Sequence, residues 1–336
     1  MVVKVSKPEI NIREKISELD KPSGIAGEAM LRAETPQEQF NLIGAGRKNM
    51  IINGENKVSQ RGDYTSATAV SSDTYYIDRW KAYESGASVT LTHKQDQSLP
   101  DGSVSHTQRY DVTVAGTGYT GAQQILEETL TVGRYYTFSA WVKSNDSNMN
   151  LFTSGGHQRS FHSGSGDWEK LSVTWRETGQ GNSYGIINYT FSGPQPMLVG
   201  NFVEFTQVQL ELGEVATPFE HRLYGEELAL CQRYFERYYP AAQMQIYNES
   251  SVANHKWIRI RHTQTMRTSP SLAGHSGIVN KSAGALGTIT GITRQSGTVN
   301  VISIRVAFNA SQGTSNALYH FDPTAAVAYL DFDAEL

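Results

Sequence analysis

The 336-residue sequence has little cysteine and no long apolar run. Its one cysteine, Cys231, excludes a disulfide framework within a single chain. No stretch reaches the roughly 18 consecutive apolar residues that a membrane-spanning helix needs. The N-terminus reaches Ser6-Lys7-Pro8-Glu9 without an apolar segment of signal-peptide length. We therefore expect a chain without a membrane span that does not leave a cell by ordinary secretion.

Charged residues are also scarce, at 18% of the sequence, against about 25% in typical soluble proteins. The net charge of −4 gives no sign of the basic face that a nucleic-acid-binding protein presents. Glycine is abundant, with 30 residues, and aromatic residues make up 10%. This composition predicts a mainly β protein with many turns. The length predicts two domains and an appendage.

Residues 1–46 differ from the rest and predict a helical arm. Ser6–Glu9 and Thr35–Glu38 are capping boxes with Pro in the first helical turn. The apolar residues behind them form narrow stripes that this segment cannot cover. We interpret the arm as an anchor that orders against a partner or against copies of the chain; the alternative is packing on its own β domain. The expected contact residues are Ile12, Ile16, Leu19, Phe40 and Ile43.

Residues 47–222 predict a jelly-roll β-sandwich of about eight short strands. Met50–Gly54 is an apolar strand candidate that ends in an Asn-Gly turn. Ala122–Leu130 is a candidate short helix or crossover. The other predicted strands are Tyr75–Tyr83, Ala87–His93, Val104–Val114, Tyr135–Ser144, Trp168–Trp175, Tyr184–Phe191 and Asn201–Leu212.

A linker helix is predicted over 223–240, because Leu228, Cys231, Phe235 and Tyr238 share one helical face. Residues 241–336 then predict a C-terminal antiparallel β domain. Its candidate strands are Trp257–Thr265, Gly287–Thr293, Thr298–Asn309 and Ala325–Phe332.

Catalytic signatures are missing, including phosphate-binding loops, nucleophile elbows and zinc-protease motifs. Paired carboxylates could carry glycosidase chemistry, but Glu127 and Glu128 are adjacent and expected to diverge. Asp167 and Glu169 share one strand face, and so do Asp331 and Asp333. A solvated strand edge explains each pair better than an active site does. We predict no enzyme activity, no cofactor and no metal site.

Aromatic side chains suggest a different chemistry, because sugar rings stack on flat apolar faces while neighbouring polar groups bind the hydroxyls. For any single aromatic residue here, core packing is the stronger expectation. His157 and His162 lie in a Gly-rich loop that could complete such a site, although an exposed loop without a ligand explains them as well. The candidate glycan-binding residues are Trp141, His157, His162, Tyr184 and Tyr189.

Several segments resemble bacteriophage virion and tail-fibre proteins of a marine type that contain a carbohydrate-binding-module-like jelly roll. Val203–Gly213 followed by Ala216–Arg222 resembles the last strand and exit of that jelly roll. Met266–Pro270 resembles a motif of the terminal β domain, and Gly24–Pro36 resembles an attachment segment. The remaining matches are Arg47–Gly62, Tyr76–Trp80, Phe138–Ser144 and Tyr224–Phe235.

The resemblance implies a structural virion protein, commonly a homotrimer. We expect a tail-fibre or adhesin subunit that docks to tail, portal-proximal or capsid proteins through residues 1–46 and binds host cell-surface polysaccharide. Its terminal domain would trimerise the fibre or face the receptor. Such a protein is made in the host cytoplasm and released by lysis, which fits a chain without disulfides. A capsid decoration or head-fibre protein is the alternative, and a glycan depolymerase is a third, less favoured hypothesis.

Overall fold

The computed structural model describes residues 48–335 except 154–158, 180, 189–192, 240–246, 249–254, 277, 282–285, 309–318 and 322–328. The chain forms two compact units, Met1–Asn49 and Met50–Leu336. The predicted helical arm and its contact residues Ile12, Ile16, Leu19, Phe40 and Ile43 lie outside the described residues, so they stay predictions. The second unit contains all the described helices and strands.

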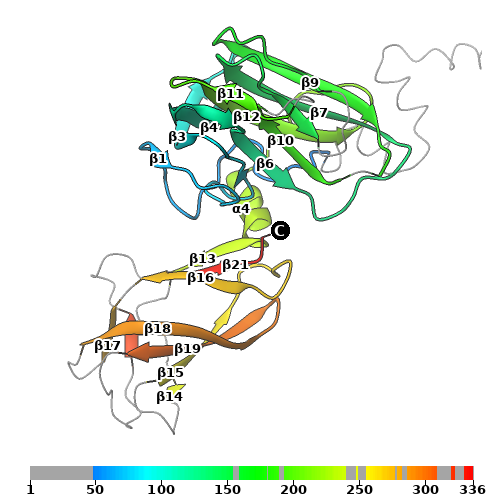
Figure 1. The fold of residues 1–336 in the computed structure, drawn as a ribbon. Helices are drawn as coiled ribbons and strands as arrows, with labels where there is room; N and C mark the ends of the chain where they lie inside the picture. The colour runs from blue at the N-terminus through cyan, green and yellow to red at the C-terminus, as the bar shows by residue number, and fades with distance from the viewer. Residues whose placement is uncertain are drawn as a thin grey trace, which may run out of the picture. The chain divides into compact units, whose positions relative to one another are not determined.

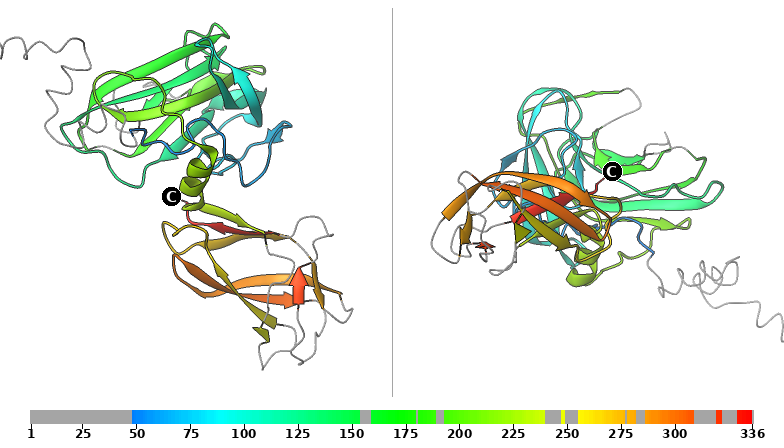
Figure 2. Two further views of the ribbon diagram at one scale, coloured as in Figure 1. Left: turned by 180° about the vertical axis from the view of Figure 1, so that it is seen from behind. Right: turned by 90° about the horizontal axis from the view of Figure 1, so that it is seen from below.

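The first part of this unit is a jelly-roll sandwich of antiparallel sheets, as the sequence predicts (Figure 1, Figure 2). The larger sheet has the order β1-β3-β4-β12-β7-β9, and the smaller sheet has the order β2-β6-β10-β8. A further pair, β11-β5, adds to them. The strands are β1 Thr68–Ala69, β2 Lys81–Ala82, β3 Ser88–Ser98, β4 Val104–Val114, β5 Gly116–Gly118, β6 Gly121–Ile125, β7 Tyr135–Ser144, β8 Asn150–Thr153, β9 Trp168–Arg176, β10 Ser183–Ile187, β11 Gln195–Met197 and β12 Phe202–Leu212.

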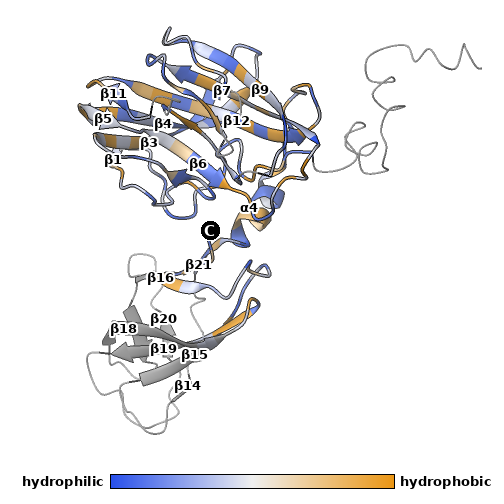
Figure 3. Ribbon diagram, turned by 45° about the vertical axis from the view of Figure 1, so that its right-hand side comes forward, coloured by the Kyte–Doolittle hydropathy of each residue, from blue (hydrophilic) through white to orange (hydrophobic). Residues whose placement is uncertain are grey.

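The core lies between the two sheets and is rich in aromatic rings. Trp80 packs edge-on against Phe205 with 5.3 Å between ring centroids. Phe138 packs in the same manner on Tyr184 at 5.9 Å. Phe138 of β7, Val173 of β9 and Phe205 of β12 point into this core. Because side chains alternate along a strand, the neighbours of these residues form the outer face of the larger sheet. Hydrophobic and hydrophilic residues therefore alternate along these strands in Figure 3.

Three local predictions in the sandwich differ from the structure. Tyr75–Tyr83 is not one strand: it contains an isolated bridge at Tyr75 and the two-residue strand β2. Met50–Gly54 is an irregular segment that hydrogen bonds to β12, since the Met50 amide donates to the Leu210 carbonyl at 2.8 Å. The Asn-Gly turn is present, with Asn53 at a φ of +59°. Ala122–Leu130 contains no helix. It begins with β6, whose central position between β2 and β10 overrides its weak strand propensity, and its second half belongs to the crossover from the smaller sheet to β7 of the larger sheet.

The observed linker helix is shorter than the helix predicted over 223–240. Helix α4 spans Tyr224–Gln232, and the next residues form strand β13, Phe235–Tyr238. β13 pairs with β21, Tyr329–Asp333, so sheet pairing wins over helical spacing at Phe235 and Tyr238.

The C-terminal β domain is antiparallel, as predicted, and its described residues form two sheets. One has the order β13-β21-β16, and the other has the order β14-β15-β19-β18-β17-β20. The remaining strands are β14 Tyr247–Asn248, β15 His255–Arg261, β16 Ser271–Ser276, β17 Ile278–Lys281, β18 Leu286–Gly297, β19 Val301–Phe308 and β20 Tyr319–Phe321.

Candidate functional site

The outer face of β7 and β9 carries an unusual pair of tryptophans. Phe138 and Val142 of β7, and Val173 of β9, point into the core. The intervening residues therefore point outward, and the 2.8 Å hydrogen bond between the Thr137 and Thr174 hydroxyls confirms a shared outer face. Trp141 and Trp168 occupy outward positions on the same two strands and are partly exposed.

Two lysines complete a four-residue group, which we call the Trp–Lys patch: Trp141, Lys143, Trp168 and Lys170. The strand register places Trp141 opposite Lys170 and Lys143 opposite Trp168. The tryptophans thus occupy one diagonal of a square and the lysines the other, with diagonal neighbours roughly 7–8 Å apart. Lys170 Nζ lies 6.0 Å from the centroid of the Trp141 ring.

The hairpin between β3 and β4 borders the patch. The Trp141 indole Nε1 donates to Asp101 Oδ2 at 3.3 Å, and Gln207 Nε2 donates to the Ser103 hydroxyl at 2.9 Å. Hydrogen bonds from Ser103 hold the pKa of Asp101 below its ordinary value. Asp101 therefore stays ionised and fixes the indole orientation from one side.

The strand on the other side, β12, contributes a buried carboxylate beside Lys143. Glu204 is opposite Lys143 in the register, but its oxygens are already bound. Lys94 Nζ donates to Glu204 Oε2 at 2.8 Å, and the Thr107 hydroxyl donates to Oε1 at 2.7 Å. Glu204 is therefore largely neutralised by other partners, and within the described residues Lys143 and Lys170 form no ion pair with any acid.

The far end of the outer face is closed by the chain leaving β12. Thr137 donates to the Gly213 carbonyl at 2.9 Å, and Thr174 donates to the Glu214 carbonyl at 3.2 Å. Ser139 is 2% exposed, whereas Ser172 is exposed. The accessible surface around the two tryptophans is thus the Trp–Lys patch together with the Ser172 hydroxyl, and Tyr135 and Arg176 are exposed at the far end of the face.

Of the predicted glycan-binding residues that the structure describes, only Trp141 is found on this surface. Tyr184 is 2% exposed and stacks on Trp175 in the core, with 5.9 Å between centroids, so no sugar can reach its ring. His162 is also 2% exposed. His157 and Tyr189 lie outside the described residues.

His162 has a structural role that the sequence did not reveal. Its Nδ1 accepts from the Gly164 amide at 2.9 Å, and Nε2 lies 3.0 Å from the Asp167 carbonyl. The imidazole thus holds the turn before β9 together from inside, and its burial leaves no exposed ring for a sugar to contact.

Trp168, Lys143 and Lys170 were missed by sequence reasoning. Alternation within Tyr135–Ser144 places Lys143 on the Trp141 face. The pairing of β7 with β9 brings Trp168 and Lys170 to the same place, and only the register shows this.

The carboxylate pairs are engaged in structural contacts. Glu169 accepts hydrogen bonds from the Ser163 amide and the Ser165 hydroxyl, both at 3.1 Å. Burial would raise the pKa of Glu169, but these bonds lower it overall. A glycosidase acid needs a raised pKa, so Glu169 is poorly suited to that role.

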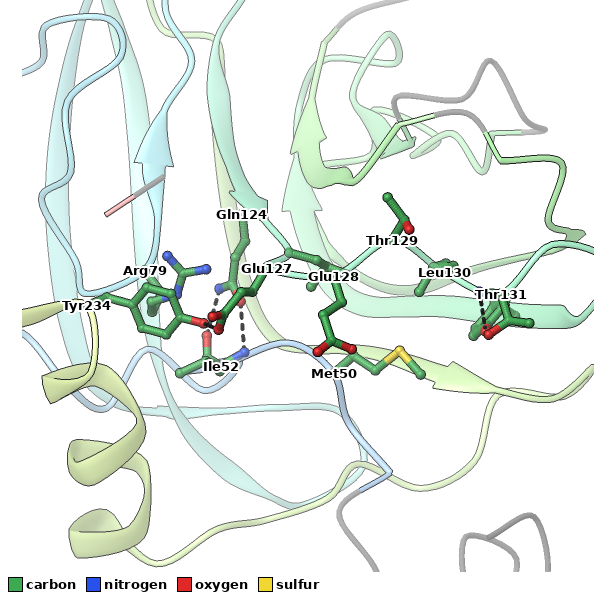
Figure 4. A pocket seen from close by; sticks show the side chains of 12 residues that line it. Met50, Ile52, Arg79, Gln124, Glu127, Glu128, Thr129, Leu130, Thr131 and Tyr234 are labelled. Atoms are coloured by element: carbon green, nitrogen blue, oxygen red, sulfur yellow. Dashed lines mark hydrogen bonds between the residues drawn. The ribbon is translucent and has the colours of Figure 1, made fainter. Parts of the chain in front are cut away.

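The other two pairs bind arginines. Arg237 forms a bidentate pair with Asp331, with both N–O distances 2.8 Å. Arg233 binds both oxygens of Glu127 at 2.7 and 2.9 Å, whereas the Glu128 side chain points in a different direction (Figure 4). Glu127 and Glu128 diverge, as expected from their adjacency.

A cavity of about 350 Å³ lies beside these glutamates, and Figure 4 shows the side chains that line it. Its polar side chains are largely committed to the protein: Gln124 bonds both the amide and the carbonyl of Ile52, and Arg79 lies over the Tyr234 ring at 3.6 Å. No group in this cavity shows a ligand chemistry as distinct as that of the Trp–Lys patch.

Among the described residues, no helix is long and apolar enough to span a membrane. No group of three or more histidine, cysteine or acidic residues in the described part of the chain could hold a metal ion.

No family model and no curated protein matches the sequence. Among solved structures, the chain is similar to the enzymatically active domain of bacteriophage CBA120 tailspike protein 4, at 13% identity and a TM-score of 0.32, over 49% of this chain and 21% of that one. It is also similar to the CBM22-1 xylan-binding domain of Paenibacillus barcinonensis Xyn10C, at 12% identity and a TM-score of 0.28, over 46% and 99% of the chains. The CBM22-1–CBM22-2 tandem domain of the same enzyme matches at 12% identity and a TM-score of 0.28, over 82% of this chain and 98% of that one. The chain thus spans about a fifth of the tailspike, and at these scores the likenesses carry no argument about ligand or activity.

Proposed function

We propose that this protein is a non-catalytic glycan-binding protein and that the Trp–Lys patch is its binding surface. The arrangement of Trp141 and Trp168 on adjacent strands carries this proposal. Both indoles belong to an ordered sheet and keep part of their surface in solvent. Rigid, partly exposed aromatic rings bind sugar C–H faces with little loss of side-chain entropy.

The polar neighbours suit the hydroxyls of a sugar. Lys143 and Lys170 donate hydrogen bonds from flexible stems, and the Ser172 hydroxyl can donate and accept. Asp101 holds the Trp141 ring in place. A sugar stacked on one indole thus meets donors on both sides.

In this proposal the chain is a virion adhesin, with residues 1–46 as its attachment segment and homotrimers as the assembled form. This part is supported by the sequence resemblance to phage tail-fibre proteins. Several copies on one particle compensate for weak single-site binding, because each further site binds at high effective concentration.

Affinity electrophoresis through gels containing a panel of bacterial surface polysaccharides tests the binding function. We expect retardation by at least one polymer, and we expect Trp141→Ala to reduce that affinity about tenfold or more, as loss of an aromatic stacking contact does. Phe161→Ala is the matched control, because Phe161 is 42% exposed and lies outside the patch. Undiminished retardation of Trp141→Ala would overturn this assignment.

The non-catalytic part of the proposal has its own readout. When the polysaccharide that retards the protein in the gel is incubated with the protein, no new reducing ends should form. Release that depends on Glu169 would show a depolymerase instead.

A further inference from the structure

We infer that the Trp–Lys patch selects anionic polysaccharides, whose sugars carry carboxylate groups. This inference rests on the proposed glycan-binding function and names the class of glycan. It follows from the positions of Lys143 and Lys170 relative to the two indoles.

Each lysine faces a tryptophan across the strand pair, Lys170 opposite Trp141 and Lys143 opposite Trp168. Directly paired side chains have Cβ atoms roughly 4.5–5.5 Å apart. A sugar stacked on either ring therefore has a cation beside it, within reach of a substituent at the ring edge. A neutral sugar would leave both lysines without the ion pair that a carboxylate substituent can form with them.

The outer face of β7 and β9 contains no acidic residue: its outward positions are Tyr135, Thr137, Ser139, Trp141, Lys143, Trp168, Lys170, Ser172, Thr174 and Arg176. The chain as a whole has a net charge of −4. Glu204, the acid nearest Lys143 in the register, is bound by Lys94 and Thr107. The patch is therefore a cationic surface on an acidic protein, and it complements an anion.

A structural explanation accounts for only one of the lysines. β9 is the last strand of its sheet, and edge strands often carry lysine, which prevents pairing with other chains. That explains Lys170. Lys143 is on β7, which is paired on both sides, by β12 and β9, so edge protection gives no reason for a lysine there.

Asp101 opposes the proposed preference and provides a sharper test. Its carboxylate contacts the Trp141 indole and interacts with Lys170, so it repels an anion at one corner of the patch. Asp101→Asn keeps an oxygen that can accept from Trp141 and removes the charge. This variant should bind an anionic polymer more tightly than the wild type does.

The experiment measures binding to polygalacturonate, to its carboxyl-reduced form, and to sulfated and unsulfated dextran. We expect polygalacturonate to bind more tightly than its reduced form, and Lys143→Gln and Lys170→Gln each to lower that affinity about two- to fivefold. A higher salt concentration should also weaken the binding of polygalacturonate, because salt screens the charges of Lys143 and Lys170. Lys81→Gln, in the other sheet, changes the net charge equally and should have no effect.

The outcomes separate this inference from the proposed function. Equal binding of both polymer forms, lost in Trp141→Ala, would overturn the anionic preference and leave glycan binding intact. Binding that is insensitive to Trp141→Ala would overturn both. Tighter binding of sulfated dextran than of polygalacturonate would contradict the assignment to carboxylates.

Discussion

Asn53 shows how one side chain can hold a whole loop of the sandwich. It is fully buried at a φ of +59°. Its Nδ2 donates to the carbonyls of Val58 and Asp78 at 2.8 and 2.9 Å, and its Oδ1 accepts from the Val58 amide at 3.0 Å. Asparagine tolerates this left-handed backbone better than most residues. The Asn-Gly pair in the sequence predicted the turn, but not its burial.

Asn53→Ala should therefore lower the free energy of unfolding by about 3 kcal/mol or more, since it combines backbone strain with unsatisfied buried polar groups. Urea denaturation measures the change. Asp96→Ala is the control, because Asp96 has a φ of +50° but is exposed, and it should cost about 1 kcal/mol. Equal losses in both variants would show that the hydrogen bonds of Asn53 contribute little.

At the scale of elements, a buried charge network connects the Gln60–Arg61 segment to β21 and the residues after it. Asp78 Oδ2 accepts from the Gln60 amide at 2.6 Å, and Arg61 lies 3.8 Å from Oδ1. Arg61 also pairs with Asp333 at 3.2 Å, and Glu335 pairs with both Arg61 and Arg79. Asp78 is fully buried in this cluster, which makes its ionisation unfavourable despite the neighbouring Arg61.

The pKa of Asp78 is accordingly raised to about 6, mainly by burial, although Arg61 and Gln60 act in the opposite direction. Between about pH 4 and 6, the folded state then holds a proton that the unfolded chain has released. The contribution of Asp78 to stability is therefore fully present below about pH 4 and is lost as the pH rises through 6, a change of about 3 kcal/mol.

Asp78→Asn removes this titration. The difference in unfolding free energy between wild type and variant, measured from pH 4 to 7, should fall by about 3 kcal/mol. Because the difference cancels the other titrating groups, a value independent of pH would show that Asp78 stays ionised in the folded protein.

Sequence patterns predicted some elements well and failed at others for physical reasons. The predicted Val104–Val114 and Tyr135–Ser144 are β4 and β7, because alternation and flanking turns agree there. The pattern over Tyr224–Tyr239 fitted a helix, but pairing with β21 turned its second half into β13. Local periodicity cannot reveal a partner almost 100 residues away.

The same limit applies to the candidate site. Trp141 and Tyr184 are both aromatic residues in strand patterns, and only the sheet arrangement shows one outside and the other in the core. The opposition of Lys143 and Trp168 depends on the register between β7 and β9. One-residue slippage would have moved either side chain to the other face.

For the whole molecule, the proposed division of labour is between an attachment arm and a folded binding unit. The unit Met50–Leu336 is compact by itself. Deletion of residues 1–46 should therefore leave a folded protein with unchanged glycan affinity that no longer joins the phage particle. Particle incorporation is measured by immunoblotting purified virions. Normal incorporation of the truncated protein would contradict the anchor.

The central claim is that glycan binds at the outer face of β7 and β9, and intrinsic fluorescence tests it most directly. Trp80 and Trp175 are buried, whereas Trp141 and Trp168 are partly exposed. Saturation with the bound polysaccharide should shift the emission of the wild type. In the variant with both Trp141→Phe and Trp168→Phe, which keeps aromatic faces for stacking, the polymer should still bind but the shift should disappear. A shift of unchanged size in that variant would place the ligand elsewhere and contradict the account.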